Sequence, residues 1–114
     1  MLTIDVYYND IKAGELTELY NYYTEHVSGY QFDYDEDYLK SDNPPVSLTL
    51  PKRKKEYISK DFFPCFSNMY CFHKGKMIEI NDFETLYECK GDDFIGAINV
   101  SSNIPNSTKE KKKI

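Results

Sequence analysis

The chain opens with a regular alternation of apolar and polar positions. Four apolar side chains are separated by single residues, the period of a half-buried strand: Leu2, Ile4, Val6 and Tyr8. Asn9-Asp10 then supplies turn chemistry, and a second apolar segment occupies residues 11–16. This pattern predicts a hairpin in which Gly14 marks a bulge or a close approach between backbones.

Aromatic residues dominate the next part of the chain. Residues 19–27 fit either a strand or a short helix, and their aromatic density favours a strand. Ser28-Gly29 interrupts the pattern, and Tyr30, Phe32 and Tyr34 then alternate with polar residues. This alternation predicts a further strand with one aromatic face.

Residues 35–50 combine an acidic turn, a proline stop and a short alternation. Asp35 to Leu39, acidic at its start and followed by Lys40, is typical of one helical turn, which Pro44-Pro45 ends firmly. Val46, Leu48 and Leu50 then alternate with hydroxyl residues, which predicts a strand pinned by Pro44-Pro45 and Pro51.

A second apolar cluster follows four consecutive cations. FFPCFSNM, residues 62–69, predicts a short helix capped by Ser59 or Asp61, with Pro64 near its first turn. Residues 73–76 read as a polar turn.

The last part of the chain predicts a helix, a strand and a tail. Asn81 or Asp82 is a plausible N-cap, and Gly91 a stop, for a helix with apolar residues at helical spacing: Phe83, Leu86 and Tyr87. Phe94–Val100 predicts a final strand with its tight point at Gly96-Ala97. From Ser101 the composition is polar, and we expect one domain over residues 1–101 and a flexible Lys-rich tail over 102–114.

These segments together predict an α+β fold. We expect a small antiparallel, barrel-like sheet of about six short strands with two or three short helices. Composition supports a ring-rich core, because 40% of the 114 residues are hydrophobic and 16% aromatic.

Charge argues against a general nucleic-acid binder. The formal net charge is −5, which does not favour binding to phosphate groups. We interpret the basic run Lys52 to Lys55 as a solvated loop and the lysines of the tail as a solvated chain end. The first ten residues lack the features of a secretory signal and no stretch approaches a membrane span, so we expect a cytoplasmic protein that contacts neither membrane nor nucleic acid directly.

Catalytic and cofactor motifs are not evident. The two histidines, His26 and His73, lie in no recognisable motif, and the scattered glycines form no phosphate-binding loop, so we expect no enzyme and no cofactor. A zinc site can be drawn from Cys65, Cys71, His73 and Cys89. Burial of single cysteines as small apolar residues is the interpretation we favour, and it predicts no metal.

Several segments occur in an order that is characteristic of a known family. They are VYYNDIKAGEL, YQFDYDEDYL, PPVSLTLP, Tyr57, FFPCFSNM and GDDFIGAI, and they extend from Ile4 to Val100. In this order they resemble the N-terminal domain of the HipA family of serine/threonine kinases, which are toxins of bacterial toxin–antitoxin modules. The chain departs from the family where Asn68-Met69 replaces the start of a Leu-Leu-Pro-Glu-Gly motif.

The resemblance implies a binding role. The sequence contains no kinase core after Val100, so we expect a free-standing, HipS-like antitoxin that binds a separate HipT-like kinase, with contact to a HipB-like DNA-binding protein through the complex. Two alternatives are an activating or structural subunit of a split kinase and a DNA-binding accessory of the module.

The residues expected to contact a partner lie in two places. They are Arg53 and Tyr57 after the predicted 46–50 strand, and the aromatic cluster Phe62, Phe63 and Phe66. Core packing is the competing interpretation for the three phenylalanines, because three rings in one short helix cannot all face solvent. Tyr7 and either Tyr22 or Tyr23 are candidates for the outer face.

Overall fold

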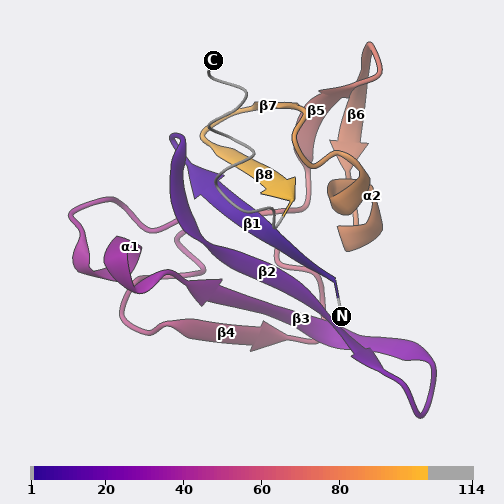
Figure 1. Ribbon diagram of the computed structural model, residues 1–114, viewed down its shortest axis with the longest axis horizontal. Coiled ribbons are helices and arrows are strands. Elements are labelled where there is room, and N and C mark those ends of the chain that lie inside the picture. The colour runs from indigo at the N-terminus through magenta and orange to yellow at the C-terminus, as the bar shows by residue number, and fades with distance from the viewer. Residues whose placement is uncertain (1, 103–114) are drawn as a thin grey trace.

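Two antiparallel sheets and two short helices make up the described chain (Figure 1). The computed structural model describes residues 2–102. The larger sheet has the strand order β4-β3-β2-β1-β8 and the smaller one β6-β5-β7. The elements are β1 (Thr3–Tyr8), β2 (Ile11–Asn21), β3 (His26–Tyr34), α1 (Glu36–Lys40), β4 (Glu56–Ser59), β5 (Met69–His73), β6 (Lys76–Ile80), α2 (Phe83–Glu88), β7 (Asp93–Ile95) and β8 (Ile98–Ser102).

The predicted first hairpin is confirmed. Asn9 and Asp10 have φ angles of 50° and 66°, a left-handed turn that these two residue types tolerate. The register of β1 against β2 shifts between Val6 and Tyr7, and Gly14 lies opposite Val6. A Cβ on Gly14 would lie 2.1 Å from the backbone oxygen of Asp33, so the close backbone approach expected at Gly14 is also present.

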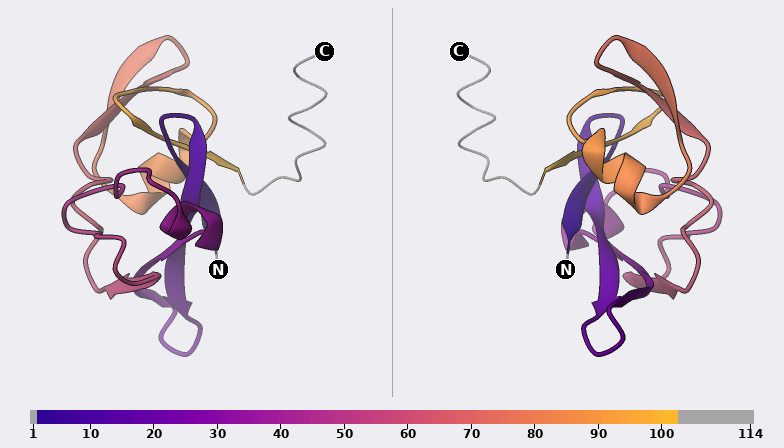
Figure 2. Two further views of the ribbon diagram at one scale, coloured as in Figure 1. Left: turned by 90° about the vertical axis from the view of Figure 1, so that its left-hand side faces the viewer. Right: turned by 90° about the vertical axis from the view of Figure 1, so that its right-hand side faces the viewer.

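The predicted strand over residues 19–27 is wrong at its centre. β2 ends at Asn21, whose side-chain oxygen accepts hydrogen bonds from the backbone N–H groups of Tyr23 (2.9 Å) and Thr24 (3.3 Å). Such an Asx-type turn reverses the chain at a position that aromatic density does not reveal. The expected break at Ser28-Gly29 lies inside β3 instead. This long hairpin and the β5–β6 hairpin project from opposite ends of the molecule in the views of Figure 2.

The core lies on one face of the larger sheet. Ile4, Leu16 and Phe32 face one another across β1, β2 and β3, and all three are fully buried. Phe66 packs on this row with its ring centroid 5.9 Å from that of Phe32. From the smaller sheet's side, Phe83 of α2 reaches Tyr30 at 6.2 Å, so ring contacts join the two parts of the fold.

The strand predicted for residues 46–50 does not form. Val46 and Leu50 are buried as the alternation predicts, but Leu48 is 94% exposed and the segment is a turn. Its backbone groups have other partners, because the Val46 N–H donates to the Tyr34 hydroxyl (2.9 Å) and the Leu50 N–H donates to the Ser47 carbonyl (3.0 Å). These two N–H groups therefore do not need hydrogen bonds to a neighbouring strand.

The helix predicted for residues 62–69 is a single turn. The Phe63 carbonyl accepts from the N–H groups of Phe66 (3.0 Å) and Ser67 (3.2 Å), and Asn68 then adopts a φ of 68°, after which β5 begins.

The described residues thus contain two helices. α1 follows the extended residue Asp35, and α2 begins after Asp82, whose side chain accepts from the Thr85 N–H at 2.9 Å as the sequence predicts.

The predicted final strand is two strands in different sheets. Gly96, with a φ of 110°, separates β7, which pairs with β5, from β8, which pairs with β1. Residues 2–102 therefore form eight strands in two open sheets, which corrects the expected barrel-like sheet of about six strands, while the α+β class fits broadly. β8 includes Ser101 and Ser102, and the rest of the expected tail lies outside the described residues.

Neither helix between residues 2 and 102 is long and apolar enough to cross a membrane.

Candidate partner-binding surface

The connection between α1 and β4, residues 41–55, is fixed by three tyrosines. Figure 1 shows this 41–55 segment beside α1 at one end of the molecule. The Tyr34 hydroxyl donates to the Leu50 carbonyl, the Tyr38 hydroxyl to the Pro44 carbonyl (2.7 Å), and the Tyr57 hydroxyl to the Pro51 carbonyl (2.5 Å). Side chains from β3, α1 and β4 thus hold a segment that has no regular structure of its own.

Burial keeps the central hydroxyl neutral. Removal of Tyr34 from water raises its pKa from 10.0 to about 12, although the hydrogen bond from the Val46 N–H favours the ionised form. A neutral hydroxyl can both donate to Leu50 and accept from Val46. This double role lets one side chain hold the middle of the 41–55 segment.

Lys52 closes the base of the segment. Its ammonium group donates to the carbonyl oxygens of Ser41 and Asn43, both at 2.7 Å, and lies 5.1 Å from the centre of the Tyr38 ring. This first cation of the basic run therefore points into the fold. The remaining three cations are exposed.

The outer side of the segment presents an apolar group and cations. Leu48 is almost fully exposed, and Arg53 makes no ion pair or hydrogen bond with any residue between 2 and 102. Lys54 lies 4.6 Å from the centre of the Tyr57 ring, and Lys55 pairs weakly with Glu36 at 3.9 Å. Because the backbone is already fixed, little conformational entropy would be lost if a partner bound to this segment.

The five residues predicted to bind a partner separate into exposed and internal ones. Arg53 is exposed, whereas Tyr57 is half-buried on the core-facing row opposite Phe32. Phe63 and Phe66 are buried, so the core-packing interpretation holds for them, and Phe62 is half-buried against Tyr30 with ring centroids 5.3 Å apart. Arg53 is therefore the candidate that the fold leaves accessible.

Leu48 is the surface residue that sequence analysis missed. The alternation of residues 46–50 placed it beside Val46 and Leu50 on one strand face, and the structure instead places it at a turn. The hydroxyls of Ser47 and Thr49 lie 3.0 Å apart. Both residue types occur often in turns, so their presence was the feature of the sequence that could have predicted a turn here.

A second exposed aromatic area lies at the β2–β3 hairpin tip. Tyr23 is 99% exposed and Tyr22 is also exposed, which confirms that an outer-face tyrosine lies here, while Tyr7 is half-buried. Tyr20 packs edge-on against Tyr22 with ring centroids 4.9 Å apart. This area is far along the sheet from the 41–55 segment, so it supplies an internal comparison for tests of that segment.

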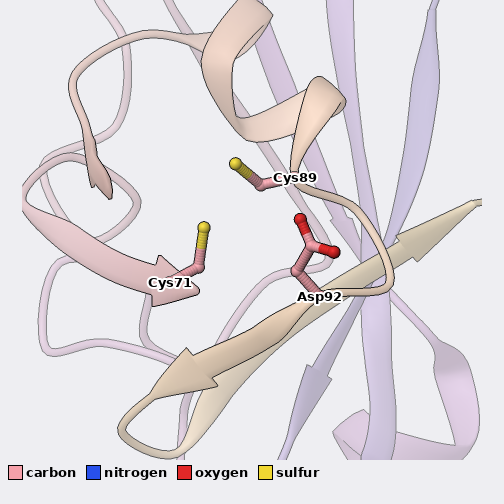
Figure 3. Close-up of side chains that lie close together, drawn as sticks. All are labelled: Cys71, Cys89 and Asp92. Atoms are coloured by element: carbon pink, nitrogen blue, oxygen red, sulfur yellow. The ribbon is translucent and has the colours of Figure 1, made fainter. Parts of the chain in front are cut away.

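The cysteines are divided between two places. Cys65 is half-buried, and its burial raises the pKa of its thiol to about 12. Cys71 and Cys89 are buried together, and a carboxylate that sequence analysis did not include, Asp92, lies with them (Figure 3). His73, the other member of the zinc set drawn from sequence, lies with its Nδ1 atom 2.5 Å from the Asp92 carboxylate. Cys65 does not belong to this cluster.

Comparison with protein families identifies the fold. The described residues form a small α+β domain of two antiparallel sheets with a fixed, cation-bearing connection at one end. The family model of the HipA N-terminal domain matches residues 4–101, and the chain therefore belongs to this family. None of the curated proteins compared with the chain matches it.

Proposed function

We propose that this chain is a non-catalytic antitoxin, which binds and neutralises a HipA- or HipT-like serine/threonine kinase encoded beside it. The family match over residues 4–101 carries the proposal, because a HipA N-terminal domain suggests a HipA-related toxin–antitoxin context. The role as a separate inhibitor of a kinase is the proposed step beyond that context. Contact with a HipB-like DNA-binding protein would follow through the complex.

The 41–55 segment is the surface we assign to the kinase. Its exposed Leu48 offers apolar area, and Arg53 offers a guanidinium group that can pair with carboxylates of the partner. Arginine is enriched among the residues that dominate interface energies, and truncation of such a residue costs about 2 kcal/mol or more. A nucleotide site lined by carboxylates would be a suitable place for such a group.

A direct role in binding DNA is less well supported. The net charge is −5, and of the four consecutive cations Lys52 is bonded inside the fold while Lys55 pairs with Glu36. Sequence-independent DNA binding requires several phosphate contacts and is strongly weakened by salt. The interaction with DNA is therefore assigned to a partner.

Co-expression with the neighbouring kinase tests both the function and the surface. We expect the wild-type chain to restore growth and to co-purify with the kinase. Leu48→Asp and Arg53→Glu should each weaken the complex at least about tenfold, which corresponds to about 1.4 kcal/mol. Tyr23→Asp is the matched control, because it places the same charge on an exposed residue at the other surface and should leave binding unchanged.

The outcomes distinguish the alternatives. A complex that raises phosphorylation without restoring growth would show an activating subunit of a split kinase. Salt-sensitive binding of DNA by the isolated chain would show a DNA-binding accessory. If the kinase neither binds the chain nor responds to it, the antitoxin proposal fails; equal loss in the Tyr23 variant would reject only the chosen surface.

A further inference from the structure

We propose that Cys71, Cys89 and Asp92 bind a zinc ion, with His73 holding the carboxylate in place. The site does not rest on the proposed antitoxin function, since none of its residues belongs to the 41–55 segment assigned to the kinase. Its three ligand atoms come from β5, from the end of α2 and from the residue before β7.

The three ligand atoms already converge. The two Sγ atoms and a carboxylate oxygen of Asp92 lie within 4.8 Å of one another, and Figure 3 shows the side chains entering the same space from three directions. A tetrahedral ion with Zn–S bonds of about 2.3 Å holds two sulfurs about 3.8 Å apart. With a Zn–O bond of about 2.1 Å, each sulfur lies about 3.6 Å from the carboxylate oxygen, so contraction by about 1.2 Å or less completes the site.

The backbone supports this convergence. Cys89 is the C-cap of α2, and its N–H donates to the carbonyls of Thr85 (3.1 Å) and Leu86 (3.2 Å) in the last helical turn. The Asp92 N–H donates to the Cys89 carbonyl at 3.0 Å, which places the carboxylate one tight turn after the thiol. Both residues are thus fixed relative to each other before any ion binds.

The donor chemistry fits zinc better than Ca²⁺ or Mg²⁺. Two thiols with a carboxylate form a mixed soft and hard set, which zinc accepts, whereas Ca²⁺ and Mg²⁺ require oxygen ligands. The thiols are buried and Asp92 is half-buried, so an ion can reach the site from the carboxylate side. On binding, each thiol releases its proton to solvent, and water fills the fourth position.

His73 has the place of an outer-shell residue. It lies two positions after Cys71 on β5, so both side chains are on the same face of the strand. Its Nδ1 atom lies 2.5 Å from one Asp92 oxygen, a contact that orients the carboxylate toward the sulfurs. Removal of such an outer-shell partner typically weakens metal binding by about 10- to 100-fold.

The ion would join elements that are individually short. β5, β6 and β7 contain five, five and three residues, and α2 contains six. A three-stranded sheet of this size depends on packing for its stability. A ligand set that spans β5, α2 and the start of β7 would tie these pieces together.

Cobalt and zinc titrations of the reduced, chelator-treated chain test the site. We expect one equivalent of Co²⁺ to bind with a thiolate-to-cobalt charge-transfer band, one equivalent of Zn²⁺ to displace it, and zinc to raise Tm by at least about 5 °C. Cys89→Ser should at least halve the intensity of the band at saturation, because one thiolate remains, and weaken binding at least 100-fold. Cys65→Ser is the matched control, since it removes a thiol outside the cluster and should change neither quantity.

Two further variants keep the test valid if Cys89→Ser does not fold. Asp92→Asn and His73→Ala alter half-buried side chains, and each should weaken binding about tenfold or more while the band of the two thiolates remains. Cobalt binding without the charge-transfer band, a loss of binding in Cys65→Ser, or a Cys71–Cys89 disulfide that forms in preference to the metal complex would each overturn the proposal.

Discussion

Asp5 is a charged side chain that the fold buries. It is 4% exposed on β1, and the ammonium group of Lys12 lies 3.3 Å from its Oδ1 atom. Burial by itself lowers the pKa of Lys12, but the carboxylates of Asp5, Asp35 and Glu15 outweigh that effect and the pKa is raised above 10.5. The contribution of Lys12 to stability is therefore present below that pH and is lost as pH rises through the pKa of the folded state.

Replacement of Lys12 should expose the cost of this buried carboxylate. In Lys12→Met, Asp5 keeps its burial but loses its cation, and we expect the free energy of unfolding in urea to fall by about 2 kcal/mol. Lys55→Met is the control, because Lys55 and Glu36 are 51% and 69% exposed and their pair should contribute less than about 0.5 kcal/mol. Equal losses in the two variants would contradict the role assigned to burial.

At the scale of elements, the 41–55 segment depends on Tyr34. This ring lies in the core between Phe32 and Tyr38. Its hydroxyl donates to the carbonyl of Leu50 and accepts from the N–H of Val46. Segments that lack strand or helix pairing need such side-chain partners for their buried backbone groups. The Tyr34 hydroxyl therefore holds the middle of the segment, while Tyr38, Tyr57 and Lys52 bond other parts of its backbone.

Tyr34→Phe should loosen this segment without removing the ring from the core. The Leu50 carbonyl and Val46 N–H lose their partner, and we expect a loss of about 2 kcal/mol in the free energy of unfolding. Trypsin should cleave after Arg53 or Lys54 several times faster than in the wild-type chain. Tyr23→Phe removes an exposed hydroxyl and should change neither stability nor cleavage; unchanged cleavage in Tyr34→Phe would show that Tyr38, Tyr57 and Lys52 suffice.

Elements with local signals were predicted well, and elements with distant partners were not. The first hairpin has its turn residues beside its strands, and α2 has Asp82 at its start, so each carries its signal within a few residues. The segments 46–50 and 62–69 have strand-like and helix-like patterns, but Val46, Leu50, Phe63 and Phe66 enter a core that includes side chains of β1, β2 and β3. Their backbone conformation is set by that packing.

At the scale of the whole molecule, the two sheets differ in size. β2 and β3 have 11 and 9 residues and lie inside the larger sheet, whereas the smaller sheet has no strand longer than five residues among those described. Contacts such as Phe83 with Tyr30 join them. Short strands with few neighbours open more readily than long central strands.

Hydrogen exchange should therefore show two levels of protection. In the metal-free chain, amides of β2 and β3 should exchange at the rate of global unfolding, while those of β5, β6 and β7 should exchange at least about tenfold faster, a difference of about 1.4 kcal/mol. Exchange measured residue by residue under native conditions checks this. Equal protection in both sheets would mean that the molecule unfolds as one unit.

Sequence alone determined the first hairpin, the helix α2 with its cap at Asp82, the aromatic core and the order of segments that resembles a HipA N-terminal domain. Each of these depends mainly on residues that are close together in the chain. Tertiary structure decided which residues are available. It buried Phe63 and Phe66, exposed Leu48 and divided residues 94–100 between two sheets. It also brought Asp92 to Cys71 and Cys89, since only the folding of β7 beside β5 places residues 21 positions apart around one point.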